Sequence, residues 1–182
     1  MADNPWKTVF KGDLIAVEKH ETKGYEHAIR PPGVRLILTN AAGELLITKE
    51  YRSEISAHDY RLPGGKVFDD IDSWLAVRGD EAALKGAVMR AARLEAKQET
   101  GVDEIRDPNI YAVSHAGASV EWDLYYVTGT IARMSEQELE ADEKERGIEV
   151  KFYAKDKVAD LLRTSGIQED RTAGVLYRYL GL

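Results

Sequence analysis

The chain has 182 residues, 43% of them hydrophobic and 8% aromatic, which suits one domain with a sizeable core plus a small extension. It carries 25 Lys and Arg against 32 Asp and Glu, a net charge of −7, so neither a general nucleic-acid surface nor an anionic-membrane surface is expected. Because it has no cysteine, it can form no disulfide, thiolate nucleophile or thiolate zinc site. The first residues lack the basic and apolar regions of a signal peptide, and no apolar run approaches membrane-spanning length, so we expect a cytoplasmic protein.

The first third of the chain is typical of antiparallel β structure. Residues 7–30 alternate loosely between apolar and polar side chains and predict the short strands of an N-terminal meander, which Pro31 and Pro32 end. Two β-rich runs, 34–39 and 44–51, flank a short connection containing Asn and Gly. This pattern predicts a β-hairpin.

One long helix dominates the middle of the chain. Residues 67–80 are loop-like, and the helix then begins near Asp80, a suitable N-cap, and ends at Thr100 before Gly101. Further strands are predicted over 109–114, 120–132 and 147–153, and further helices over 156–163 and 171–180. A mixed sheet with few helices predicts an α/β sandwich.

One face of the predicted helix combines apolar and acidic side chains. At 100° per residue, a single stripe contains Leu84, Val88, Ala91, Glu95, Gln98 and Glu99. Glu95 and Glu99 continue the core-facing stripe in the last turn, so both desolvation and the helix dipole oppose their charge. A shared hard cation would offset both unfavourable effects, because carboxylates four residues apart can bind it together. Mg²⁺ is the expected cation. The alternative is a frayed helix end that leans into solvent.

A turn with two adjacent glycines precedes this helix. Gly64 and Gly65 lack a Cβ, which lets backbone carbonyl and amide groups approach a metal or a phosphate closely. The alternative is an ordinary tight turn.

Two segments together carry a more specific pattern: Leu62-Pro63-Gly64-Gly65-Lys66, then Ala91-Ala92, Glu95, Glu99 and Thr100-Gly101-Val102. They resemble the Nudix box, which has a glycine start and a helix carrying Arg-Glu-x-x-Glu-Glu-x-Gly. The match is partial, because Leu94 stands where the family has arginine and Gln98 where it has the first glutamate of the pair. About fifteen extra residues also separate Gly65 from Ala91.

Flanking segments are similar to one branch of that family, the ADP-ribose and GDP-mannose pyrophosphatases. These segments are 50–52, 114–117, 143–150 and 159–177. The resemblance implies a Nudix-type α/β/α sandwich with a mixed sheet over residues 32–182, and an antiparallel β extension over residues 1–31. It also implies Mg²⁺-dependent or Mn²⁺-dependent hydrolysis of a nucleoside diphosphate sugar to a nucleoside monophosphate and a sugar phosphate. The implied assembly is a homodimer in which the N-terminal strands lie against the partner's catalytic domain and contact the substrate base.

The resemblance also implies roles for particular residues. Glu95, Glu99 and the Gly65 carbonyl would hold the metal, with Gln98 keeping one acceptor oxygen beside them. In the resembled branch the general base is a glutamate on a later loop, and the acidic stretch 135–146 is expected to form that loop. Its candidates for the base are Glu140, Glu143 and Glu145, with Glu138 nearby. The alternative for this stretch is a solvated acidic linker.

Four further side chains are candidate substrate contacts. Arg52 could pair with two phosphate oxygens through its planar guanidinium, Trp6 and Tyr25 could stack on a nucleobase, and His115 could contact sugar or phosphate. The alternatives are an ordinary ion pair for Arg52, packing for the aromatic residues and simple exposure for His115.

Two other functions fit the same residues. Leucine at 94 and glutamine at 98 are compatible with a Nudix protein that binds nucleotide sugars without turnover, as a sensor or scaffold. A nucleoside triphosphate or a capped RNA is the alternative substrate of an active enzyme.

Overall fold

A mixed sheet lies at the centre of the computed structural model, which describes residues 5–182. Its strands follow the order β10-β5-β4-β9-β7, with β6 paired to β5. They are β4 (Gly33–Thr39), β5 (Leu45–Arg52), β6 (Ala57–Arg61), β7 (Val102–Ser114), β9 (Leu124–Met134) and β10 (Glu149–Tyr153). Strand β4 runs parallel to β9 and antiparallel to β5. The sheet is therefore mixed, as predicted.

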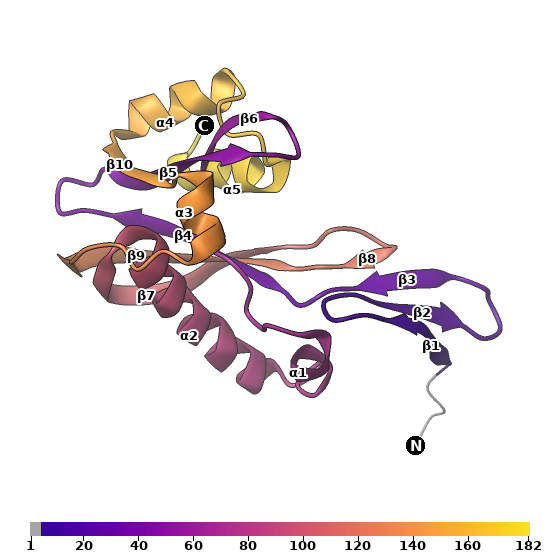
Figure 1. Ribbon diagram of the computed structural model, residues 1–182. Helices are drawn as coiled ribbons and strands as arrows, with labels where there is room; N and C mark the ends of the chain where they lie inside the picture. The colour runs from indigo at the N-terminus through magenta and orange to yellow at the C-terminus, as the bar shows by residue number, and fades with distance from the viewer. Residues whose placement is uncertain (1–4) are drawn as a thin grey trace.

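Helices cover both faces of this sheet, with α2 (Glu81–Thr100) on one side and α4 (Lys155–Arg163) and α5 (Asp170–Leu180) on the other (Figure 1). Alternation along β4 divides the core, because successive side chains of a strand point to opposite faces. Leu36 and Leu38 pack with Val88 of α2, whereas Ile37 packs with Val175 of α5. These layers form the expected α/β/α sandwich.

The local signals for two of these elements are visible in the structure. The Asn40 side chain accepts hydrogen bonds from the Ala42 and Glu44 amides, both at 3.0 Å, which closes the β4–β5 hairpin. Asp80 caps α2 by accepting from the Ala83 amide at 2.9 Å. Both features confirm the sequence prediction.

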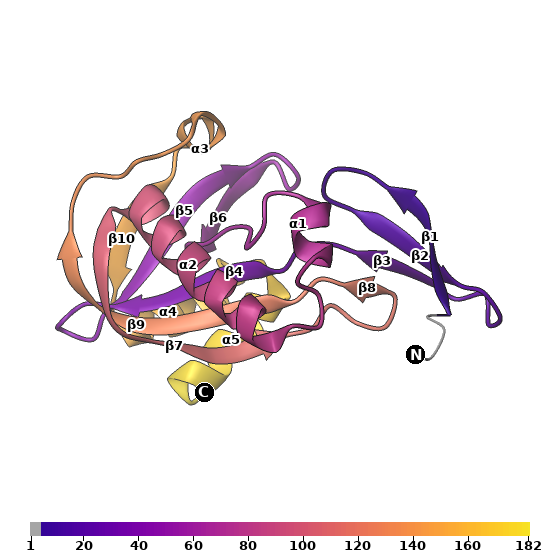
Figure 2. The same cartoon turned by 90° about the horizontal axis from the view of Figure 1, so that it is seen from below.

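A second, smaller sheet projects from the body (Figures 1 and 2). It contains β1 (Trp6–Lys11), β2 (Ala16–His20) and β3 (Glu26–Ile29), which form the predicted meander, and also β8 (Val120–Glu121). Strand β8 comes from the excursion between β7 and β9 and pairs with β3 in parallel. The extension is therefore assembled from two distant parts of the sequence.

A short helix, α1 (Ile71–Leu75), joins the two parts of the molecule. The Asp70 side chain caps it by accepting from the Ser73 amide at 2.8 Å, and the Ile71 amide donates to the Asp13 carbonyl at 2.8 Å. Ile71 and Trp74 pack on Ala16 and Ile29 of the small sheet. The loop expected over 67–80 is thus wrong at its centre, because the Asp70 cap and this apolar contact stabilise a helical turn.

Two further differences concern elements without a strong local signal. Strand β6 was not expected, and the acidic stretch contains the helix α3 (Ala141–Arg146) where a loop was expected. Within residues 5–182, the helices are too short or too polar to cross a lipid bilayer.

Candidate active site

A cavity of about 1080 Å³ opens where the glycine turn, the end of α2 and α3 meet. The side chains and backbone that surround it include most of the residues singled out in the sequence. Among them are Arg52, Gly64, Gly65, Leu94, Glu95, Gln98, Glu99, Glu140, Glu143 and Glu145.

Each glycine of the turn lies against one glutamate of α2. Gly64 has a φ of +144°, and a Cβ there would lie 2.1 Å from the Val34 carbonyl oxygen, so a side chain is excluded. Its amide donates to Glu99 Oε2 at 2.6 Å. A Cβ on Gly65 would lie 2.1 Å from Glu95 Oε1. The missing side chains thus let the end of the helix close onto the turn.

The carbonyl groups of the turn also have hydrogen-bond partners. The Gly65 oxygen accepts from the Val34 amide at 2.9 Å, and the Gly64 oxygen accepts from Arg35 Nη1 at 3.1 Å. A carbonyl oxygen has two lone pairs, so the Gly65 oxygen can accept the Val34 amide and still serve as a ligand. The metal role of Gly65 stays a prediction.

Three carboxylates converge in the cavity. Glu95, Glu99 and Glu143 each offer one oxygen, and these oxygens lie within 4.8 Å of one another. Glu99 is 7% exposed and Glu143 is 8% exposed. Burial, and then the charge of Glu143, raise the pKa of Glu95 to about 7. Burial raises the pKa of Glu99 to about 8, against the opposing effect of the Gly64 amide.

This arrangement fits a hard divalent cation. Three carboxylates, two buried and one half-buried, repel one another, and a cation would offset both the repulsion and the burial. Oxygen donors of this kind are those that Mg²⁺ and Mn²⁺ prefer. Glu95 lies close against Gly65, which has no side chain, and this contact fixes the position of one candidate ligand.

The three candidates for the general base occupy different positions. Glu143 lies in the carboxylate cluster, and its Oε2 accepts from the Glu140 amide at 2.7 Å. The exposed Glu140 accepts at Oε1 from Gln98 Nε2 at 3.5 Å, and Glu145 lines the cavity from an exposed position. Gln98 therefore contacts Glu140, the N-cap residue of α3. The metal role of Gln98 stays a prediction.

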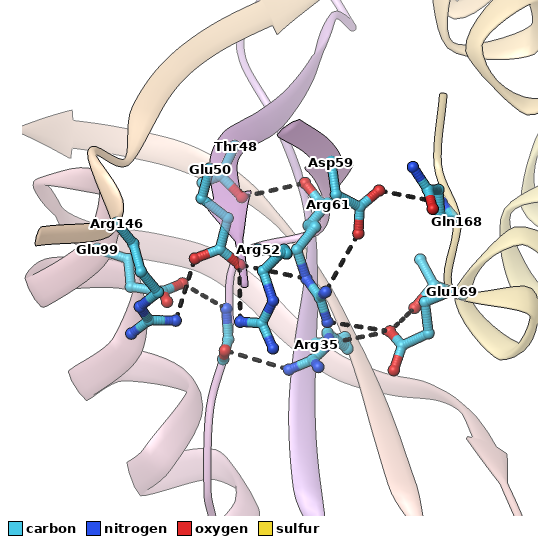
Figure 3. Close-up of polar contacts among 12 residues, drawn as sticks. Arg35, Thr48, Glu50, Arg52, Asp59, Arg61, Glu99, Arg146, Gln168 and Glu169 are labelled. Atoms are coloured by element: carbon cyan, nitrogen blue, oxygen red, sulfur yellow. Dashed lines mark hydrogen bonds and ion pairs between the residues drawn. The ribbon is translucent and has the colours of Figure 1, made fainter. Parts of the chain in front are cut away.

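A network of arginines and acids borders the cavity, and sequence reasoning missed most of it (Figure 3). Arg35 points to the α5 side of the sheet and pairs with Glu169 at 3.2 Å. Arg61 lies 3.1 Å from Asp59 and 3.4 Å from Glu50. An arginine inside the apolar run of β4 was the one available signal, since buried charges require partners.

Arg52, the candidate phosphate contact, belongs to this network. It pairs with Glu50 at 3.3 Å and also with the more exposed Glu54. It lines the main cavity and a smaller adjoining one of about 380 Å³, together with Arg30 and Arg146. Several guanidinium groups thus border the space that an anionic ligand would enter.

Three predicted substrate contacts lie elsewhere. The Trp6 ring packs edge-on against His20 with centroids 5.0 Å apart, and Tyr25 is 63% exposed in the small sheet. His115 pairs with Asp123 at 2.8 Å. Among the described residues, these three do not belong to the lining of either cavity. Their substrate roles stay predictions.

The layered sheet, the glycine turn and the acid-bearing helix define a Nudix-like fold. A solved structure described as "Crystal structure of ADP compounds hydrolase" matches with a TM-score of 0.63 over 97% of this chain and 93% of that chain. The two chains are 19% identical, a level at which the likeness concerns the fold. No protein-family model matches the sequence, and no curated protein matches it.

Proposed function

We propose that this protein hydrolyses the pyrophosphate bond of nucleoside diphosphate sugars of the ADP-ribose and GDP-mannose type, giving a nucleoside monophosphate and a sugar phosphate. The observation that carries the proposal is the convergence of Glu95, Glu99 and Glu143 within 4.8 Å in a large cavity. The fold it shares with a protein described as an ADP compounds hydrolase supports it. We place the reaction in the cytoplasm and propose no nucleic-acid or membrane partner.

The carboxylate cluster would hold the metal. Glu95, Glu99 and Glu143 supply oxygens, with the Gly65 carbonyl as a fourth donor and Gln98 as a polar neighbour. When bound, Mg²⁺ or Mn²⁺ neutralises pyrophosphate charge and makes water more acidic. The buried position of the cluster strengthens its interaction with a cation, because the local dielectric is low.

The base and the phosphate contact come from the rim of the cavity. Because Glu143 lies in the cluster, Glu140 and Glu145 are the stronger candidates to accept the proton of the attacking water. Arg52, oriented by Glu50 and Glu54, would bind phosphate oxygens through two N–H groups.

The substrate's base and sugar would be bound partly by a second subunit. In the proposed homodimer, the small sheet of one subunit meets the catalytic part of the other, and Trp6 and Tyr25 contact the nucleobase. His115 would contact the sugar or a phosphate. The exposure of Tyr25, at 63%, is compatible with such a contact.

Product analysis tests the reaction directly. The protein is incubated with ADP-ribose, GDP-mannose or a deoxynucleoside triphosphate, in Mg²⁺ or in EDTA. We expect metal-dependent release of AMP or GMP. Glu99→Gln should lose more than about 100-fold in kcat, since even outer-shell changes at metal sites cost 10- to 100-fold. Glu104→Gln, at an exposed position of β7, is the control and should keep activity.

Other outcomes would point to the alternatives. Tight binding of ADP-ribose without turnover would favour the sensor, and pyrophosphate release from the triphosphate would favour the nucleotide hydrolase. Unchanged kcat in both Glu140→Gln and Glu145→Gln would show that the base lies elsewhere.

A further inference from the structure

Glu50 is a buried carboxylate at the point where three arginines meet (Figure 3). Glu50 as a whole is 5% exposed. Its Oε2 accepts from Arg146 Nη1 at 3.0 Å, and its Oε1 lies 3.3 Å from Arg52 Nη1 and 3.4 Å from Arg61 Nε. These arginines come from the end of α3, from β5 and from β6. One side chain thus connects three separate elements.

Arg146 is the last residue of α3, the helix that carries Glu143. The segment leading into this helix is attached to the last turn of α2, because Gln137 Nε2 donates to the Glu99 carbonyl at 2.5 Å and the Glu138 amide donates to the Gln98 carbonyl at 3.0 Å. The far end of the segment meets β5 through the Arg146–Glu50 pair. Glu143 lies between these two attachments.

We propose that Glu50 is a positioning residue for the metal centre. By binding Arg146 it holds α3 over the cavity, so that Glu143 stays beside Glu95 and Glu99. The same carboxylate orients Arg52 along the cavity wall. The inference rests on the proposed function, because that function requires the metal site that Glu50 would help to position.

Glu50 can hold Arg146 in place because its buried negative charge balances the positive charges of the surrounding arginines. The Glu50 carboxylate gives each guanidinium an acceptor in a place with little water, where charge-assisted hydrogen bonds are strong. Glu50→Gln keeps the shape of the side chain and removes its charge, so Arg52, Arg61 and Arg146 then repel one another across a neutral amide. Arg146 is the most solvent-exposed of the three, at 30%, and is therefore the one that moves away.

The test measures Mn²⁺ binding to the substrate-free protein by electron paramagnetic resonance, which reads the metal site without catalysis. Glu50→Gln should weaken Mn²⁺ binding about tenfold, the lower end of the range for outer-shell residues. Arg146→Met should cause the same loss, and the double variant should lose no more than either single variant, because both changes break one contact. Glu18→Gln is the matched control. Glu18 is also a largely buried carboxylate, 13% exposed and 3.2 Å from Arg78, but it lies in the small sheet, so Mn²⁺ affinity should not change.

Each result decides something. An unchanged Mn²⁺ affinity in folded Glu50→Gln, or losses that add in the double variant, would overturn the positioning role alone. If Glu50→Gln does not fold, Arg146→Met at the helix end still decides between a tenfold loss and none. If the wild-type protein binds no Mn²⁺, both the proposed function and this inference fail.

Discussion

Glu99 shows what burial does to a single carboxylate. Its pKa is raised from 4.5 to about 8, first by burial. Between these two values, the folded metal-free protein holds a proton that the unfolded chain releases. The contribution to stability is therefore fully present below pH 4.5 and is lost as the pH rises through about 8.

This shift gives a prediction for the metal-free protein. In EDTA, the free energy of unfolding of the wild type relative to Glu99→Gln should fall as the pH rises from 5 to 9, by up to about 1.4 kcal/mol per pH unit for one group. Urea denaturation at pH 5, 7 and 9 measures it. Added Mg²⁺ should stabilise the wild type more at pH 9 than at pH 6, because the ligands must be deprotonated. A difference that does not vary with pH would contradict the raised pKa.

For single residues, some positions could be predicted from the sequence and others only from the structure. Helical spacing alone predicted that Glu95 and Glu99 point inward, and the structure confirms that position. The roles of Glu50 and Glu169 could not be read in this way, because their partners lie on other elements that no local period connects. Glu143 was one of several acids in a row, and only the folded chain singles it out.

Among the elements, α1 lies within the long spacer between the glycine turn and α2. It packs Ile71 and Trp74 against Ala16 and Ile29, and the Lys11–Asp72 pair at 2.7 Å adds a second contact. The spacer is therefore a structural bridge between the small sheet and the cavity-bearing body.

Truncation of this bridge should loosen the small sheet. Ile71→Ala removes a side chain that is 1% exposed and should cost about 2–4 kcal/mol locally, as buried large-to-small changes do. Hydrogen exchange should rise in β1–β3 and stay unchanged in β4 and β9. Ile55→Ala, at a position 44% exposed, is the control, with an expected effect within about 0.5 kcal/mol. Equal exchange increases throughout the molecule would contradict a bridge of this kind.

The elements missed from the sequence share a physical cause. Strand β6 has the sequence Ala57-His58-Asp59-Tyr60-Arg61, without the β-branched run that favours strands. Its pairing with β5 and the bonding of Asp59 to the Gln168 amide at 3.1 Å hold it in place. Such tertiary support is invisible in a local pattern, whereas α2 and the β4–β5 hairpin carry their own caps and turns.

For the whole molecule, the unusual feature is an outlying sheet with apolar side chains facing solvent. Val9, Phe10 and Ile15 are between 46% and 56% exposed. Isolated apolar residues on a surface are common, but Val9 and Phe10 in β1 and Ile15 in the turn after it are close in the chain and all exposed, which suits an interface. This surface is where the proposed second subunit would be bound.

Light scattering after gel filtration tests the assembly. We expect the wild type at twice the chain mass of 20.4 kDa and Phe10→Asp close to 20.4 kDa, because an interface disfavours a buried unpaired charge. Leu182→Asp is the control, since Leu182 has the same 56% exposure as Phe10 but lies at the other end of the chain. A wild type that runs at the single-chain mass at high concentration would refute the dimer.

The parallel pairing of β3 with β8 has a practical consequence for anyone who wishes to trim this protein. The small sheet looks like a separate module. It is nevertheless attached to the body by strand β8, from the second half of the chain, and by the α1 bridge. A version beginning at residue 32 would uncover Ile71 and Trp74 and leave β8 with a bare edge. Surfaces of that kind pair with other chains, so we expect the shortened protein to aggregate rather than to form a smaller stable domain.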